Sequence, residues 1–305
     1  MVAGACSSTA ATTAPTATPV PATPTTVASI AASASVAPSA AALPVIPADQ
    51  LIKAGTLTVC SDTSYPPQET LDSSNKAIGS DIDLITEVAK RLGLTLSVKS
   101  TVFDSIIPAL TGGTCDISIS AQTINADRQA KLDMIPYFAA GQSFVVLKGN
   151  PSNIKTLDDL CGKTVAAEKG TVEADHITGG ASGYDDTTAL SPLCKSKGKA
   201  AITLKVFDAD TAALLALQSG TVQAHFTDEP VAFYEVTNGN GKFEVVPALT
   251  LERAPEGICV TKNHTGLRDA VKAAVQQMMD DGTYLQILTK WNVQSGAITS
   301  TAASS

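Results

Sequence analysis

The sequence predicts an α/β fold in which largely parallel strands are covered by helices on both faces. Strand and helix patterns alternate from Leu51 onward, and after Leu147 the alternation starts afresh. Such alternation is typical of parallel sheets. The chain has 305 residues, which is long enough for two domains of ordinary size. We therefore predict two α/β units.

Residues 1–48 precede this alternation. From Ser7 to about residue 47 the chain is nearly all Ala, Thr, Ser and Pro, so it cannot bury enough surface to offset the entropy of ordering. We predict a disordered tether there. Before it, Val2-Ala-Gly-Ala-Cys6 resembles the end of a bacterial lipoprotein signal, although the basic and apolar regions of a signal are missing. We interpret residues 1–48 as a truncated signal plus tether, with Cys6 lipidated; a chance match is the alternative.

The first unit begins with a short strand and a loop whose prolines, Pro66 and Pro67, prevent the strand from continuing. A capping-box-like start at Ser80 and Asp83 precedes an apolar stripe with helical period. The predicted elements, in order, are a strand at 56–59, a helix ending at 93, a strand at 94–98, a short helix at 103–110 and a strand around 117–119.

A strand is predicted at 143–147, and the second unit starts after it. Asp228-Glu-Pro230 predicts the capped start of one of its helices. Its other elements are a helical turn at 157–160, strands at 164–166 and 222–227, and a helix at 210–219. A strand at 257–260 and helices at 266–281 and 283–291 follow, and periodicity does not say which unit they join.

The stretch from Ser118 to Arg128 is the most informative about function. Ile117 and Ile119 alternate with serines, so Ser120 to Thr123 should lie at the carboxyl end of a half-buried strand, where α/β sheets bind ligands. Arg128 follows Thr123 by about one helical turn, so its fork and the Thr hydroxyl can converge on one carboxylate. We interpret this as the site of an amino acid's α-carboxylate. The alternative is that Arg128 is a solvated arginine on the surface of a helix.

Charge and composition exclude several classes of partner. The chain carries 21 basic and 29 acidic residues, a net charge of −8, and no basic run, which argues against nucleic acid and anionic membrane surfaces. No apolar run reaches the length of about 18 residues that spans a membrane. Neither C-x-x-C nor H-x-x-x-H occurs, so no metal site is predicted. The histidines His176, His225 and His264 are scattered, and we expect each to be structural or exposed.

Seven motifs follow one another over roughly residues 50–293. They are Asp62-Thr-Ser-Tyr65-Pro-Pro, Gly79-Ser-Asp-Ile-Asp-Leu84, Phe103-Asp-Ser-Ile-Ile-Pro-Ala-Leu110, Ser120-Ala-Gln-Thr-Ile124 with Arg128, Lys169-Gly-Thr171, Gly220-Thr-Val-Gln-Ala224 with Asp228, and Asp281-Gly-Thr-Tyr284 with Lys290-Trp291. Together they resemble the motifs of bacterial extracytoplasmic amino-acid-binding proteins, the substrate-capturing subunits of ABC importers. Gln68 and Ser80 depart from that pattern where aromatic residues are usual, which weakens packing inferences.

The resemblance implies a two-lobed fold of the type II periplasmic-binding-protein class, with two mixed sheets flanked by helices and a two-strand hinge. Lobe one would comprise residues 50–144 plus 255–293, lobe two residues 145–254, and residues 294–305 a disordered tail. It also implies no cofactor, a monomer, an extracytoplasmic location (lipid-anchored to the outer face of the cell membrane through Cys6, or periplasmic), and delivery of a free amino acid to an ABC permease.

The same resemblance implies the ligand-binding residues. Arg128 would hold the α-carboxylate and Asp228 the α-ammonium group, although Asp228 could merely cap its helix. Tyr65 and Phe103 would lie on either side of the ligand side chain. The alternative for Phe103 is ordinary packing in the core. The full implied set is Asp62, Tyr65, Phe103, Ser120, Thr123, Arg128, Glu168, Thr171 and Asp228.

Asp62 and Glu168 decide the expected ligand. Two carboxylates near two aromatic faces favour a cationic side chain, so arginine or lysine is the leading ligand. A polar neutral ligand such as glutamine stays open, because Asp62 also accepts from an amide. We expect a binder and not an enzyme, because Arg128, Thr123 and Asp228 already describe a complete amino-acid recogniser. A periplasmic dehydratase on the same scaffold and a ligand-sensing subunit are the alternatives.

Five cysteines remain after Cys6. An exported chain would oxidise suitable pairs, and Cys161 and Cys194 both lie on short connecting segments of the expected lobe two. We favour a disulfide between them. The pairing of the other three is left open, and their odd number leaves at least one thiol unpaired: Cys60, Cys115 and Cys259.

Overall fold

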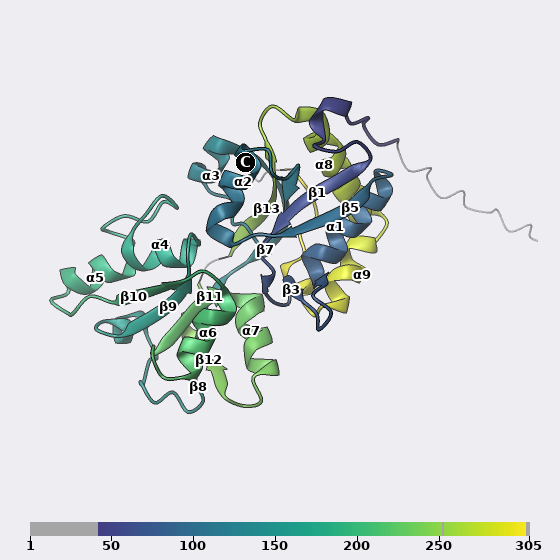
Figure 1. Cartoon of the computed structure of the whole chain (residues 1–305). Helices are drawn as coiled ribbons and strands as arrows, with labels where there is room; N and C mark the ends of the chain where they lie inside the picture. Colours follow the sequence, from purple (N-terminus) through teal and green to yellow (C-terminus); the bar gives the residue numbers. More distant parts are fainter. Residues whose placement is uncertain (1–41, 252, 303–305) are drawn as a thin grey trace, which may run out of the picture. The chain divides into compact units, whose positions relative to one another are not determined.

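The computed structural model describes residues 42–251 and 253–302, so the expectations for Cys6 and most of the tether lie outside the described residues. Two five-stranded mixed sheets, each with helices on both faces, form two lobes (Figure 1). The predicted α/β class is confirmed. None of the described helices is long and apolar enough to cross a membrane.

Lobe one is built around a sheet in which β1 pairs in parallel with β5 and β6, while β13 runs antiparallel to β6 and β7. Almost every residue of β1 is buried, as expected for a strand covered on both faces. In spatial order the strands are β5 (Thr95–Ser100), β1 (Thr56–Ser61), β6 (Ile117–Ser118), β13 (Ala254–Thr261) and β7 (Leu132–Ala140).

The helices of lobe one bury opposite faces of this sheet. The apolar stripe of α1, with Leu84, Ile85 and Val88, packs with α8 and α9 over one face, and Ile106 and Leu110 of α2 cover the other. The predicted capping box is wrong, because α1 begins at Ser80 with no side-chain cap and Asp83 instead accepts a hydrogen bond from Trp291 Nε1 (2.7 Å). The helices are α1 (Ser80–Arg91), α2 (Ile106–Thr111), α3 (Ala126–Lys131), α8 (Thr265–Asp280) and α9 (Thr283–Lys290).

Lobe two repeats the architecture. Its sheet packs α4 and α5 against one face and α6 and α7 against the other, each over a separate apolar cluster. In spatial order the strands are β10 (Thr203–Phe207), β9 (Thr164–Glu168), β11 (Ala224–Asp228), β8 (Gln142–Leu147) and β12 (Phe243–Val245). The helices are α4 (Val172–Thr178), α5 (Leu190–Ser196), α6 (Asp210–Gln218) and α7 (Glu229–Asn238).

The chain crosses between the lobes twice, at Gly141 between β7 and β8 and again just before β13. The predicted boundary after residue 144 is therefore a few residues too late, because Phe144 is already in the core of lobe two. Strand β7 was not predicted. It contains Pro136, which argues against a strand, but the pairing with β13 is irregular at Gly257, where Pro136 lies, and a bulge can accommodate a proline.

A third, three-stranded sheet occupies the segment that was predicted to be only a loop. It consists of β2 (Ser64–Tyr65), β3 (Glu69–Leu71) and β4 (Ala77–Ile78). Gly79 follows it with φ 137°, and a Cβ there would overlap the carbonyl group of Gln68, so only glycine fits. This small sheet holds Tyr65 in place.

Two disulfides form within residues 42–251 and 253–302. The predicted bond Cys161–Cys194 joins segments of lobe two, with a Cα–Cα distance of 5.5 Å. The pairing that the sequence left open is Cys60–Cys115, with a Cα–Cα distance of 5.7 Å, and Cys259 is a buried free thiol.

The described part of the predicted disordered tail, residues 294–302, is ordered and packed. Gly296 is buried against the ring of Phe138, Ile298 N donates to the Tyr284 hydroxyl (3.0 Å), and Thr301 is buried. The prediction failed because this segment is small and polar, and its burial depends on a partner, Phe138, that is distant in the sequence.

Substituting Gly296 by alanine should therefore lower the free energy of unfolding by about 1–3 kcal/mol, because the added Cβ would overlap the ring of Phe138. Urea denaturation measures this loss. Ser295→Ala is the matched control, since Ser295 is exposed, and its effect should stay within about 0.5 kcal/mol. Equal stability of the two variants would show that the packing is not needed.

Candidate functional site

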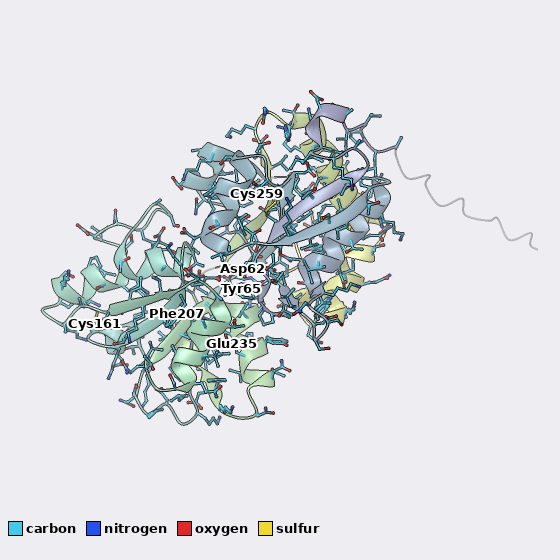
Figure 2. All side chains as sticks on the ribbon, viewed as in Figure 1. Asp62, Tyr65, Cys161, Phe207, Glu235 and Cys259 are labelled. Carbon is cyan, nitrogen blue, oxygen red and sulfur yellow. A yellow bond between two sulfur atoms is a disulfide. The ribbon has the colours of Figure 1, made fainter. Side chains whose placement is uncertain are left out.

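The nine residues predicted to bind the ligand come from both lobes, and contacts join several of them: Asp62 with Phe103, Ser120 and Glu168, Phe103 with Arg128, and Tyr65 with Asp228. Asp62, Tyr65, Phe103, Ser120, Thr123 and Arg128 come from lobe one, and Glu168, Thr171 and Asp228 come from lobe two. Figure 2 labels Asp62 and Tyr65 in this region. Direct contacts join the lobes here, including the ion pair between Lys169 Nζ and Asp104 Oδ2 (2.9 Å).

Arg128 is a buried cation in the first turn of α3, only 5% exposed. The Asn125 side chain caps that helix by accepting from Arg128 N (2.9 Å). Within the described residues, the guanidinium donates to two backbone carbonyls, that of Thr123 (2.8 Å) and that of Gly170 in the other lobe (3.2 Å). Thr123 thus contacts Arg128 through its carbonyl, and the contact of its hydroxyl with a ligand carboxylate stays a prediction. Burial lowers the pKa of Arg128, which shows that the charge lacks full compensation.

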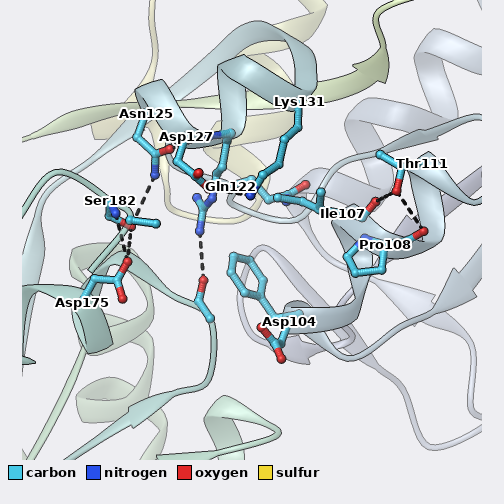
Figure 3. Close-up of a pocket in the computed structure, with 14 residues that line it drawn as sticks. Asp104, Ile107, Pro108, Thr111, Gln122, Asn125, Asp127, Lys131, Asp175 and Ser182 are labelled. Carbon is cyan, nitrogen blue, oxygen red and sulfur yellow. Dashed lines mark hydrogen bonds and ion pairs between the residues drawn. The ribbon is translucent and has the colours of Figure 1, made fainter. Parts of the chain in front are cut away.

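The guanidinium borders a cavity of about 540 Å³, a size that suits a small ligand (Figure 3). Both lobes line it: Phe103 and Gln122 from lobe one, Asp175 and Ser182 from lobe two. The ring of Phe103 lies 5.3 Å from the Arg128 guanidinium carbon, within cation–π range. Of the nine predicted residues, Phe103 and Arg128 line this cavity, and the other seven are not among its lining residues.

Tyr65 contacts the expected ammonium partner directly. Its hydroxyl donates to Asp228 Oδ2 (2.8 Å) and accepts from Asp228 N (3.0 Å) and Thr227 Oγ1 (3.1 Å). Burial, followed by the neighbouring Glu173 and Glu256, raises the pKa of Asp228 well above its usual value. Tyr65 therefore links the lobes through its hydroxyl, a role that the predicted aromatic sandwich did not include.

Asp62 and Glu168 bring two carboxyl groups together from opposite lobes. Asp62 accepts from Ser64 N and Phe103 N (both 2.8 Å), and Glu168 accepts from Ser64 Oγ (3.4 Å). Glu168 is 2% exposed. Its burial, and then the charge of Asp62, raises its pKa to about 11, and the two side chains are hydrogen-bonding neighbours. A cation placed between them would relieve this repulsion.

The hydroxyls of Ser120 and Thr171 are already used inside the protein. Ser120 Oγ donates to Glu69 Oε1 and accepts from Asp62 N (both 2.8 Å). Thr171 caps α4: its Oγ1 accepts from Ala174 N (3.3 Å) and donates to the Glu168 carbonyl (2.8 Å). Both residues thus position Asp62 and Glu168.

Sequence reasoning missed several buried acids around the site. Glu173 neighbours Asp228, and burial raises the pKa of Asp81 to about 7. Glu69 and Glu256 are buried with it. Asp81 stands inside a motif that carried the resemblance, which was the one signal available. Nothing in the sequence pattern marked the others.

A second buried cluster lies in lobe two. His225 Nε2 is 2.9 Å from Asp210 Oδ1 and His225 Nδ1 is 3.3 Å from Glu235 Oε2, so His225 is structural, as one of the two expected readings had it. These three residue types could bind a metal ion. However, each ring nitrogen faces a different carboxylate, and the two carboxylates raise the pKa of His225. This geometry suits a protonated imidazole that is held by two acids.

Comparison with known proteins gives matches over most of the chain. The family model of bacterial extracellular solute-binding proteins, family 3, matches residues 57–294. The arginine-binding protein ArgT of Corynebacterium glutamicum is 30% identical over 250 residues, which cover 82% of this chain and 78% of ArgT. The L-cystine-binding protein TcyJ of Escherichia coli is 29% identical over 238 residues, 78% of this chain and 82% of TcyJ. The structure of an ancestral arginine-binding protein bound to arginine matches with a TM-score of 0.68 and 37% identity, covering 78% of this chain and 98% of that one.

The raised pKa of Glu168 has a measurable effect on stability. A carboxyl group whose pKa is raised on folding binds its proton more tightly in the folded state, so between its usual pKa of 4.5 and about 11 the free energy of unfolding falls as pH rises. Glu168→Gln should remove this fall, so the slope of the free energy of unfolding against pH should become less steep by up to about 1.4 kcal/mol per pH unit. Urea denaturation of the ligand-free protein at pH 5, 6.5 and 8 measures the slope.

The partly exposed Glu244, on β12, provides the control for this measurement. Glu244→Gln should leave the pH slope of the wild-type protein unchanged between pH 5 and 8, because the pKa of Glu244 is lowered and the residue titrates below that window. If Glu168→Gln shows the same slope as Glu244→Gln, Glu168 does not hold a proton in the folded protein.

Proposed function

This chain belongs to the bacterial extracellular solute-binding proteins, family 3, and we propose that it captures a free amino acid with a cationic side chain, arginine first, between its lobes. The observation that carries the proposal is the presence, near the interlobe contacts, of one buried guanidinium, Arg128, and of buried carboxyl groups from both lobes, Asp62 and Glu168. The match to arginine-binding relatives supports the same ligand.

The head of the amino acid would be held at Arg128 and Asp228. A carboxylate is a far better partner for a guanidinium than two neutral carbonyls, because both groups are charged and the fork can bind it at two points. The α-ammonium group would bind Asp228, whose carboxylate accepts only from the Tyr65 hydroxyl and a neighbouring carboxyl among the described residues. Ser120, Thr123 and Thr171 would support these contacts from the strand and helix ends.

The side chain of the ligand would lie against Asp62 and Glu168. A guanidinium or ammonium group there would neutralise a carboxyl pair that is otherwise forced to hold a proton. Phe103 and Tyr65 supply aromatic faces for such a cation. Glutamine is the alternative ligand, because its amide could donate to Asp62 while Glu168 stays protonated.

Ligand contacts from both lobes would stabilise the closed arrangement. Arg128 belongs to lobe one and Asp228 to lobe two, so an amino acid that binds both joins the lobes. The crossings at Gly141 and before β13 are the places where the lobes could rotate. Closure of this kind would present one defined surface to a membrane permease.

The family is extracellular and binds solutes, and two relatives from Escherichia coli and Chlamydia trachomatis are named as arginine-binding proteins of ABC transporters. We extend this to the chain as a monomeric binder that delivers its amino acid to an ABC permease, attached to the membrane through a lipid on Cys6. The relatives compared above are binding proteins by name, and we propose no enzymatic step. Incubation with candidate amino acids would reveal a dehydratase through altered products.

Calorimetric titration with arginine, lysine, histidine, glutamine and glutamate tests the specificity. Arginine should bind most tightly. Glu168→Gln should lower the affinity for arginine by about 10- to 100-fold, because one charged hydrogen bond is lost. Glutamine should be affected less than about threefold, because a neutral amide does not need the charge. Tighter binding of glutamate than of arginine would contradict the cationic preference.

A further inference from the structure

Glu173 is a buried acid beside the amino-acid site that no part of the proposed function uses. It lies on α4, two residues after Thr171, and is only 2% exposed. Among the described residues its Oε1 has no hydrogen-bond partner. Its carboxyl group is a hydrogen-bonding neighbour of the Asp228 carboxyl. A buried carboxyl oxygen without a hydrogen-bond partner lowers the stability of the fold, unless a ligand donates to it.

The groups around Glu173 and Asp228 are mostly neutral or acidic. Arg128 on α3 is the cation that faces Glu173, and Gln142 on β8 donates to it. Tyr184 lies nearby and stacks on His176, whose pKa is lowered to about 4 by burial, so that ring is neutral at pH 7. Asp228 faces the Tyr65 hydroxyl on β2 and the Glu256 carboxyl on β13.

Arg128 does not account for Glu173 as a simple counter-ion. Among the described residues no ion pair within 4.0 Å joins them, and the guanidinium donates to the carbonyls of Thr123 and Gly170 instead. The Glu173 and Asp228 carboxyls therefore face each other without a cation in direct contact with either. A hydrogen bond between two carboxyl groups needs a proton on one of them, because an ionised carboxylate can only accept, so the contact implies a shared proton without ligand. Burial is the largest cause that raises the pKa of each.

We propose that Glu173 is a second acceptor for the α-ammonium group of the bound amino acid, beside Asp228, and that this ammonium group expels the proton the two carboxyls share. The inference rests on the proposed function, since it concerns the same site. An ammonium group has three donors, so two carboxylates and one further acceptor satisfy it. The balance is simple: the charged ligand enters, one proton leaves to the solvent, and both carboxylates become ionised.

The consequence concerns which part of the ligand is recognised. The Asp62–Glu168 pair responds only to a cationic side chain, whereas the Asp228–Glu173 pair responds to the ammonium group that every free amino acid carries. Glu173 thus selects for amino acids over carboxylic acids that lack the amine. It also makes binding stronger as pH rises, about tenfold in association constant per pH unit for each proton released.

Calorimetry in two buffers of different ionisation enthalpy, phosphate and Tris at pH 7, gives the number of protons released when arginine binds. The wild-type protein should release at least about one proton, and Glu173→Gln should release about one fewer and bind arginine more weakly. Glu173→Asp, which keeps a carboxyl group, should restore the release. Glu244→Gln, at a partly exposed position of β12, is the control and should match the wild type.

The outcomes separate this inference from the proposed function. If the wild-type protein binds no amino acid, both fail. If it binds arginine but Glu173→Gln releases as many protons as the wild type, the role of Glu173 is wrong while the proposed function stands. If Glu173→Gln does not fold, the Glu168→Gln variant decides, because it lacks the proton that arginine would displace from the Asp62–Glu168 pair. In that variant, an arginine affinity that does not change between pH 5.5 and 7.5 overturns the inference, and an affinity that rises supports it.

Discussion

The buried charge of Arg128 is the constraint around which the site is arranged. A guanidinium removed from water costs several kcal/mol unless its donors are satisfied and an anion lies near. Here the carbonyls of Thr123 and Gly170 satisfy donors without neutralising the charge. One carbonyl belongs to each lobe. The guanidinium, which has no anion as a partner among the described residues, therefore also makes a hydrogen bond that forms only when the lobes are close. Helix α3 fixes its position through the Asn125 cap.

The acids at the lobe interface complement that constraint. Asp62 and Glu168 form one pair, Asp228 and Glu173 another, and in the ligand-free protein burial favours protonation of at least one member of each. An amino acid with a cationic side chain carries one negative and two positive groups, which matches one guanidinium and two acidic pairs. The ligand would thus supply the charges that the protein lacks, so closure and recognition have one electrostatic origin.

Features that could be predicted from the sequence depend on local interactions, and features that could not depend on interactions between distant residues. Alternation and helical periodicity are local, so the α/β class, the stripe of α1 and the strand before Arg128 could be predicted. Strand β7 was missed because Pro136 breaks the local rule and a bulge opposite Gly257 compensates. The partners of the Tyr65 hydroxyl and of Glu173 are distant in the sequence, so no spacing pattern could predict these contacts.

The central claim, that Arg128 receives the ligand's carboxylate, is tested most directly by ligand-induced thermal stabilisation. Arginine at about 100 times its Kd should stabilise the wild-type protein by about 2.7 kcal/mol and raise its Tm. For Arg128→Ala, measured against its own ligand-free Tm, we predict no rise, while Arg268→Ala, which removes a partly exposed arginine paired with Asp133, should respond as the wild type does. A Tm rise in Arg128→Ala equal to that of Arg268→Ala would contradict the account.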